Sequence, residues 1–180
     1  MANKKTSVFG LFSSSAAAER GVEALISAGF SNNAISVLMQ DNQSTQDFAH
    51  EKHTKAPEGT ATGAATGGVV GGTLGLLAGI GLLAIPGIGP FVAAGPIMGA
   101  LAGIGVGGTV GGLIGALVGL GIPEYEAKRY EGHLKTGGVL LSVHCNTGDE
   151  ITRAKAILTG TSATDIAATT ESAVSVTASH

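Results

Sequence analysis

The middle of the chain lacks charge: between Gly59 and Pro123 there is no Asp, Glu, Lys, Arg or His. Across all 180 residues, charged side chains make up 13% and the formal net charge is −3, so the basic patch that nucleic-acid binding needs is missing. Tryptophan is absent and aromatic residues are 4%, which argues against stacking on bases. The single cysteine, Cys145, excludes an internal disulfide and fits a reducing compartment.

The N-terminal part carries an ordinary globular pattern. "TSVFGLF" (6–12) predicts a strand, "SSSAAAERGVEALISAGF" (13–30) a serine-capped helix that stops at Gly29, and "NNAISVLMQ" (32–40) a second strand. The inward helix positions are Ala17, Val22, Leu25 and Ile26, and Ile35, Val37 and Met39 alternate along the second strand.

The C-terminal part has the same pattern of short strands and amphipathic helices. "PEYEAKRYEGHLKTG" (123–137) predicts a helix with acidic residues early and basic residues late, including an exposed Glu124–Lys128 pair. "GVLLSVHCN" predicts a strand, "TGDEITRAKAILTG" a helix with Gly160 as its C-cap, and "ATDIAAT" a short last strand. The order β-α-β, then β-α-β, predicts an α+β fold of the ferredoxin-like kind, an antiparallel sheet with two helices on one face.

Between these parts, glycine recurs at every fourth position in two series. The turn-forming "IPGIGP" at 85–90 separates them, so we predict an antiparallel helical hairpin with helices at 62–85 and 95–121. At 1.5 Å per residue the helices would be about 36 and 40 Å long, enough to cross a hydrocarbon core of about 30 Å. The predicted packing residues of this glycine zipper are Gly63, Gly67, Gly71, Gly75, Gly79, Gly95, Gly99, Gly103, Gly107, Gly111, Gly115 and Gly119.

Glycine is costly inside a helix, by about 1 kcal/mol relative to alanine at each position. The two series together forgo something like 10 kcal/mol, comparable to the stability of a whole domain. Close approach of another helix can offset this cost, because bare backbone allows dispersion contacts and weak Cα–H···O bonds. We therefore predict that the hairpin packs against other copies of the chain. A flexible glycine-rich linker is the alternative, against which the many leucines and isoleucines argue.

The predicted organisation follows from these patterns. Lysines and an arginine flank the uncharged region on both sides, which favours cytosolic ends if the hairpin enters a membrane. We expect the N-terminus not to be a secretory signal, because its apolar run is short and broken. We expect the first half of the α+β unit at 1–41, a polar linker at 42–60, the hairpin at 61–122, the second half at 123–170 and a tail at 171–180.

The candidate catalytic and ligand-binding motifs lack residues that their chemistry requires. "GIGVGG" (103–108) matches a dinucleotide loop, but no strand precedes it and no acidic residue follows at the right distance. His50 and His53 lie three apart without further ligands nearby, and His144 and Cys145 are strand neighbours that point to opposite faces. Cys145 is therefore interpreted as a small core residue. We predict no catalytic, cofactor-binding or metal-binding residue, no cofactor and no small-molecule substrate, and hence no enzyme.

Three segments carry a resemblance to a known family. "VFGLFSSSAAAERGVEALISAGFSNNAISVLM", "GIPEYEAKRYEGHLKTGGVLLSV" (121–143) and the glycine-rich "AIPGIGPFVAAGPIMGALAG" resemble the YflT-like general stress proteins over about residues 6–169. The resemblance implies a bacterial protein tied to general stress, with a glycine-rich insertion and no established catalytic residues.

The sequence thus predicts a non-enzymatic, stress-associated protein that associates with itself through the glycine zipper. The first hypothesis inserts the hairpin in, or attaches it to, the cytoplasmic membrane, with the lipid bilayer as a partner beside other copies. The second is a cytoplasmic, water-soluble scaffold, such as a filament, tube or shell, with the hairpins buried between subunits. A small-ligand sensor is a third class, but no residue pattern supports it.

Overall fold

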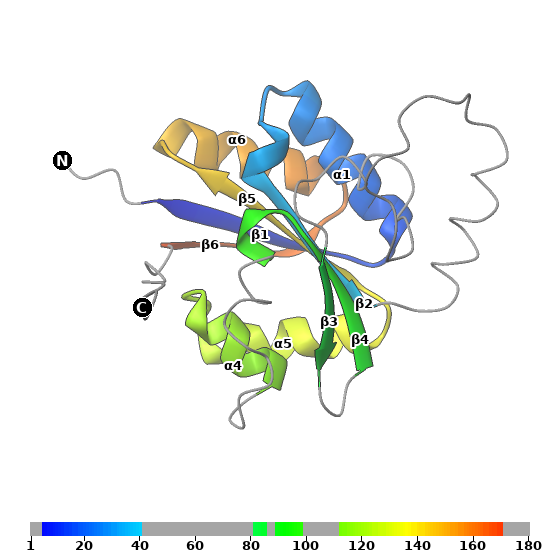
Figure 1. Cartoon of the computed structure of the whole chain (residues 1–180). Coiled ribbons are helices and arrows are strands. Elements are labelled where there is room, and N and C mark those ends of the chain that lie inside the picture. The colour runs from blue at the N-terminus through cyan, green and yellow to red at the C-terminus, as the bar shows by residue number, and fades with distance from the viewer. Residues whose placement is uncertain (1–4, 41–80, 86–88, 99–111, 171–180) are drawn as a thin grey trace, which may run out of the picture.

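The computed structural model describes residues 5–40, 81–85, 89–98 and 112–170 (Figure 1). The predicted linker at 42–60 and tail at 171–180 lie outside these ranges. In chain order the elements are β1 (Thr6–Phe12), α1 (Ser15–Ser27), the 3₁₀ helix η1 (Asn32–Ala34), β2 (Ile35–Gln40), β3 (Gly81–Ile85), β4 (Gly89–Ala94), α4 (Gly112–Gly119), α5 (Glu124–Lys135), β5 (Val139–Cys145), α6 (Gly148–Gly160) and β6 (Thr164–Thr170). The mixed α+β class that the sequence predicts is confirmed.

Local sequence signals place the helices of the two terminal parts. α1 begins after Ser14, whose hydroxyl oxygen accepts a hydrogen bond from the Ala17 amide at 3.3 Å. α6 begins after Thr147, which accepts a bond from the Glu150 amide at 3.2 Å, while the Glu150 carboxylate accepts one from the Asn146 amide. The prediction that Gly160 caps α6 is wrong by one residue, because Gly160 is still helical and Thr161 is the C-cap.

The strands form one antiparallel sheet with the order β3-β4-β2-β5-β1-β6. β5 lies between β1 and β2, with Leu141 opposite Gly10 on one side and Val37 on the other. β3 and β6 are the two edges. The strands of the N-terminal and C-terminal parts therefore interleave at the centre of the sheet, and the pair β3 and β4 extends it beyond β2.

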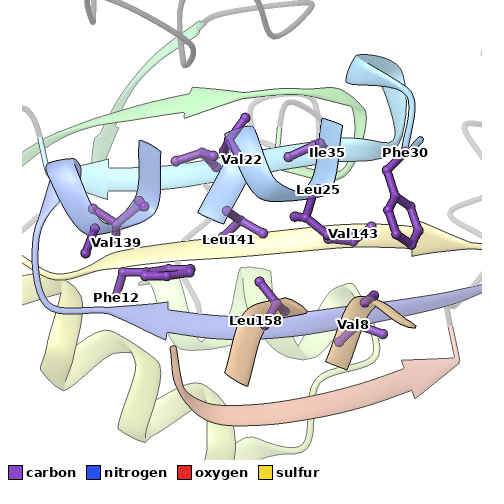
Figure 2. Packing of buried hydrophobic residues seen from close by; sticks show 14 of the residues in the cluster. Val8, Phe12, Val22, Leu25, Phe30, Ile35, Val139, Leu141, Val143 and Leu158 are labelled. Atoms are coloured by element: carbon purple, nitrogen blue, oxygen red, sulfur yellow. The ribbon is translucent and has the colours of Figure 1, made fainter. Parts of the chain in front are cut away.

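One face of the sheet is covered by α1 and α6 (Figure 1). Figure 2 shows Val22 and Leu25 of α1, with Leu158 of α6, lying over the apolar side chains of β5 and β1. The predicted inward residues of α1 and β2 belong to this core, since Ala17, Val22, Leu25, Ile35, Val37 and Met39 are buried and Ile26 packs against them. Cys145 is buried here too, as predicted.

The opposite face is covered as well, by α5 and α4 (Figure 1). Phe9, Leu38 and Leu140, which alternate with residues of the first core, are at most 1% exposed. Tyr130 and Leu134 of α5 pack against them. The expectation of helices on one face only is therefore wrong, because the sheet is buried on both sides.

The predicted first helix of the hairpin, at 62–85, is wrong over its last five residues. Residues 81–85 form β3, which pairs with β4 so that Ile85 lies opposite Gly89. The physical reason is a contact between distant parts of the chain. β4 pairs with β2 from Phe91 to Ala94, and this pairing gives hydrogen-bond partners to backbone groups on a side of β2 that would otherwise be a sheet edge. Pro90, which has no amide hydrogen, lies outside the stretch paired with β2.

The predicted second helix, at 95–121, is also not continuous. Gly95 has a φ of +91° and Gly112 a φ of +52°, so a regular right-handed helix does not run through either residue. Residues 96–98 are helical, and α4 begins at Gly112. Leu113, Ala116 and Leu117 of α4 are buried together with residues of the sheet.

Candidate association surface

Three glycines of the predicted zipper lie in the described residues, and they do not share one role. Gly95 follows β4, whereas Gly115 and Gly119 belong to α4. Gly95 is buried, and the other two are exposed. The remaining predicted packing residues, Gly63, Gly67, Gly71, Gly75, Gly79, Gly99, Gly103, Gly107 and Gly111, lie outside the described residues.

Gly95 packs inside its own subunit, directly over β2. A Cβ at this position would overlap the carbonyl oxygen of Ile35 and lie 2.6 Å from the Cα of Ser36. Two residues later, the Ile97 amide donates a hydrogen bond to the Ser36 hydroxyl at 3.0 Å. Gly95 therefore lets the chain turn from the sheet towards the second face, and its contact is not one between subunits.

The two glycines of α4 face outwards. Leu113, Ala116, Leu117 and Leu120 recur at i, i+3, i+4 and i+7 and are buried, which places the opposite side of the helix at the surface. That side, the α4 outer face, consists of Gly112, Gly115, Val118 and Gly119. Gly112 is half-buried, Gly115 and Gly119 are exposed, and Val118 is 42% exposed. Among the residues that the structure describes, no atom lies within 4 Å of a Cβ added at Gly119.

The α4 outer face differs from the outer face of its neighbour α5. α5 presents the predicted Glu124–Lys128 ion pair at 2.7 Å, and the Glu131–Lys135 pair at 2.9 Å. The hydrogen bond from Lys128 lowers the pKa of Glu124. Such charged faces are usual for surface helices, whereas bare backbone and valine are not. Tyr125, 65% exposed at the start of α5, is the other large hydrophobic residue exposed within the described ranges.

A polar cluster joins α5 to the edge strand β6, and sequence analysis missed it. Arg129 Nη1 lies 2.6 Å from Asp165 Oδ1, and His133 Nε2 lies 3.8 Å from the other carboxylate oxygen. The Tyr130 hydroxyl donates a hydrogen bond to the Asp165 carbonyl oxygen at 3.2 Å. Burial of Tyr130, with smaller contributions from Glu126 and Asp165, raises its pKa far above the usual 10, so the hydroxyl keeps its proton. We name these four residues the Asp165 clasp.

Two buried serines lie side by side on the second face of the sheet. Ser36 of β2 and Ser142 of β5 are cross-strand neighbours, and both are fully buried. The Ser36 hydroxyl accepts the Ile97 hydrogen bond, but within the described part of the chain the Ser142 hydroxyl has no partner. A buried polar group without a partner costs about 1–3 kcal/mol.

Replacing each of the two serines by alanine should change the free energy of unfolding in opposite directions. Ser142→Ala should raise the free energy of unfolding by about 1 kcal/mol, because it removes an unsatisfied hydroxyl. Ser36→Ala should lower it by about 1–2 kcal/mol, because the Ile97 amide loses its acceptor. Urea unfolding followed by circular dichroism measures both, and changes of the same sign in the two variants would contradict the assignment.

Of the other candidate residues weighed in the sequence, the structure describes only His144 and Cys145. His144 and Cys145 are neighbours on β5, with Cys145 buried and His144 partly exposed. His50, His53 and the 103–108 motif lie outside the described residues. Within the ranges that the structure describes, no three His, Cys, Asp or Glu side chains are arranged to hold a metal ion.

None of the protein families, curated proteins and solved structures with which the chain was compared matches it. The resemblance to the YflT-like general stress proteins therefore stays a prediction. Of the helices within the described residues, none combines the length and the apolar character needed to cross a membrane.

Proposed function

We propose that this is a non-enzymatic protein that associates with itself through the α4 outer face, in the stress-related role that its family resemblance implies. The observation that carries the proposal is the exposure of Gly115, Val118 and Gly119 on one side of a helix whose other side is buried. A helix at a protein–water boundary normally presents polar side chains there. This one presents backbone and an aliphatic side chain.

Energetic considerations support a helix as the partner of this face. Each exposed helical glycine costs about 1 kcal/mol relative to alanine. A second helix that approaches the bare backbone closely recovers this cost through dispersion and Cα–H···O contacts. Because Gly115 and Gly119 are both exposed on the same side of α4, another copy of α4 fits the face best.

We also propose that the unit carrying α4 is of the ferredoxin-like type. Its support is the strand order β2-β5-β1-β6, in which the strands of the two β-α-β halves interleave, with α1 and α6 on one face. In this arrangement α4 is an addition on the other face, held by Leu113 and Leu117. A rigid sheet would then present the α4 outer face in a fixed orientation.

A contact between copies is favoured here over insertion of a two-helix hairpin into the cytoplasmic membrane. Insertion of both predicted helices would require β3 to leave its pairing with β4, and Leu113 and Leu117 to leave the core. Those changes would sacrifice packing that the folded unit already has. Attachment to the membrane surface remains a competing occupant of the same face, and the experiment below separates the two.

Gly119→Leu is expected to reduce self-association by tenfold or more in dissociation constant, about 1.4 kcal/mol, because the leucine side chain separates the facing backbones. Since an added Cβ at Gly119 meets no atom, the subunit itself should fold normally. The matched control is Gly132→Leu on α5, where an added Cβ also meets nothing and the glycine is exposed. Sedimentation velocity in detergent-free buffer measures the association.

Unchanged association in Gly119→Leu, or equal loss in both variants, would contradict the proposal. Flotation with vesicles of phosphatidylethanolamine and phosphatidylglycerol is the second measurement. Wild-type protein that floats with the vesicles, and a Gly119→Leu variant that neither floats nor differs from wild type in sedimentation, would identify the bilayer as the occupant.

A further inference from the structure

The edge strand β6 has a sequence that favours pairing with a further β-strand. Among the described strands it pairs with β1 alone, and it forms one end of the sheet. Its seven residues, TDIAATT, include Ile and three Thr but no Lys, Pro or Gly. Edge strands of this composition readily pair with strands of other molecules unless some device prevents it.

β6 contains such a device near its start. Phe9 of β1 lies opposite Ala167 and Leu11 lies opposite Thr164, so two residues of β6, Asp165 and Ile166, face the single residue Gly10. This is a β-bulge, and bulges bend and twist an edge away from further pairing. Asp165 has a φ of +47°, a left-handed conformation that is uncommon for non-glycine residues and that Asp adopts more readily than most of them.

The surroundings that hold Asp165 come from α5. The Asp165 clasp contacts the carboxylate through Arg129 and His133 and the backbone carbonyl through Tyr130. Tyr130 is 1% exposed, so its hydroxyl is a fixed anchor. On the side of β1 the bulge is equally confined, because a Cβ at Gly10 would lie 3.2 Å from Ala163 and 3.3 Å from Leu158.

We propose that the Asp165 clasp maintains the bulge and thereby prevents β6 from pairing with β6 of a second copy of this chain. A second copy of the chain is the partner that we propose, because a straightened β6 can pair antiparallel with β6 of that copy about a twofold axis. Centred on Ala167, that pair sets Asp165 opposite Thr169 and Ile166 opposite Ala168, so no like charges meet and a large residue faces a small one. This interface would be separate from the α4 outer face.

The test compares Asp165→Val with Asp165→Gly in the full-length chain. Valine is strongly disfavoured at positive φ and favours a straight strand, whereas glycine keeps the bulge at no conformational cost. The readout is hydrogen exchange of the amides of residues 166–170, measured at low and high protein concentration. In Asp165→Val these amides should exchange about tenfold more slowly at high concentration, because a second copy protects them. In wild type the exchange should not depend on concentration. Asp165→Gly loses the carboxylate contacts but keeps the Tyr130 bond to the backbone and tolerates positive φ, so its dependence on concentration should be smaller than that of Asp165→Val.

Arg129→Ala is the second variant, and it tests the role of the Asp165 clasp if Asp165→Val fails to fold. It removes the shortest contact of the clasp without altering the sequence of β6, and Arg129 is half exposed, so folding should be retained. Concentration-dependent protection of residues 166–170 is expected again, in smaller measure. Exchange that is independent of concentration in every folded variant would overturn the proposal. Concentration-dependent protection in Asp165→Gly equal to that in Asp165→Val would do so too.

Discussion

Gly95→Ala is expected to lower the free energy of unfolding by about 3 kcal/mol or more, a large share of the stability of an ordinary domain. Two costs add. Alanine at a φ of +91° is strained by about 1–3 kcal/mol, and its Cβ would overlap the Ile35 carbonyl oxygen and crowd the Cα of Ser36. Both neighbours are backbone atoms of a central strand, so neither can move aside without disturbing β2. Urea unfolding monitored by circular dichroism measures the loss.

The matched control belongs to the same glycine series. At Gly119 an added Cβ meets no atom of the described residues, and the residue is helical, so Gly119→Ala should leave stability unchanged or raise it by up to about 1 kcal/mol. A small effect at both positions would show that Gly95 does not form the close approach described here. Equal large losses at both would contradict the exposed position of Gly119.

Sequence reasoning located the elements of the two terminal parts because their signals are local. Ser14 caps α1, Thr147 begins α6, and the apolar residues of both helices recur at helical spacing. The strand at 6–12 was recognisable because runs of this length with turn residues on either side are typical of strands. The second strand, predicted at 32–40, is wrong over its first three residues, which form η1, and right from Ile35 onwards. These patterns do not depend on what the rest of the chain does.

The hairpin prediction failed where distant contacts decide the structure. Gly81–Ile85 and Gly89–Ala94 are short apolar runs that fit a strand or a buried helix equally well, and the pairing of β4 with β2 selects the strand. A period of four suggested one role for all the glycines. Gly95 is instead required by the backbone of β2, while Gly115 and Gly119 face outwards. The spacing of the glycines alone does not show which of them lies in a tight turn against another strand and which lies on the exposed side of a helix.

The Asp165 clasp illustrates a further limit. Arg129 and Asp165 are 36 positions apart, and nothing in either local sequence links them. The contact exists because α5 covers the second face of the sheet, which the β-α-β order alone did not predict. The exposed side of α5 with its i,i+4 ion pairs was predictable, whereas the residues that reach β6 were not.

Leu140→Ala and Leu141→Ala test whether both faces of the sheet are buried. These neighbours on β5 point to opposite faces, and both are fully buried, Leu141 against α1 and α6 and Leu140 in the core beneath α4 and α5. Each truncation should therefore lower the free energy of unfolding by about 2–5 kcal/mol. Urea unfolding measures both losses in one background, and the slope with urea should stay unchanged if only stability is altered. A sheet covered on one face alone predicts a loss for Leu141→Ala and almost none for Leu140→Ala, so a loss below about 1 kcal/mol for Leu140→Ala would mean that α4 and α5 do not pack on the sheet in solution.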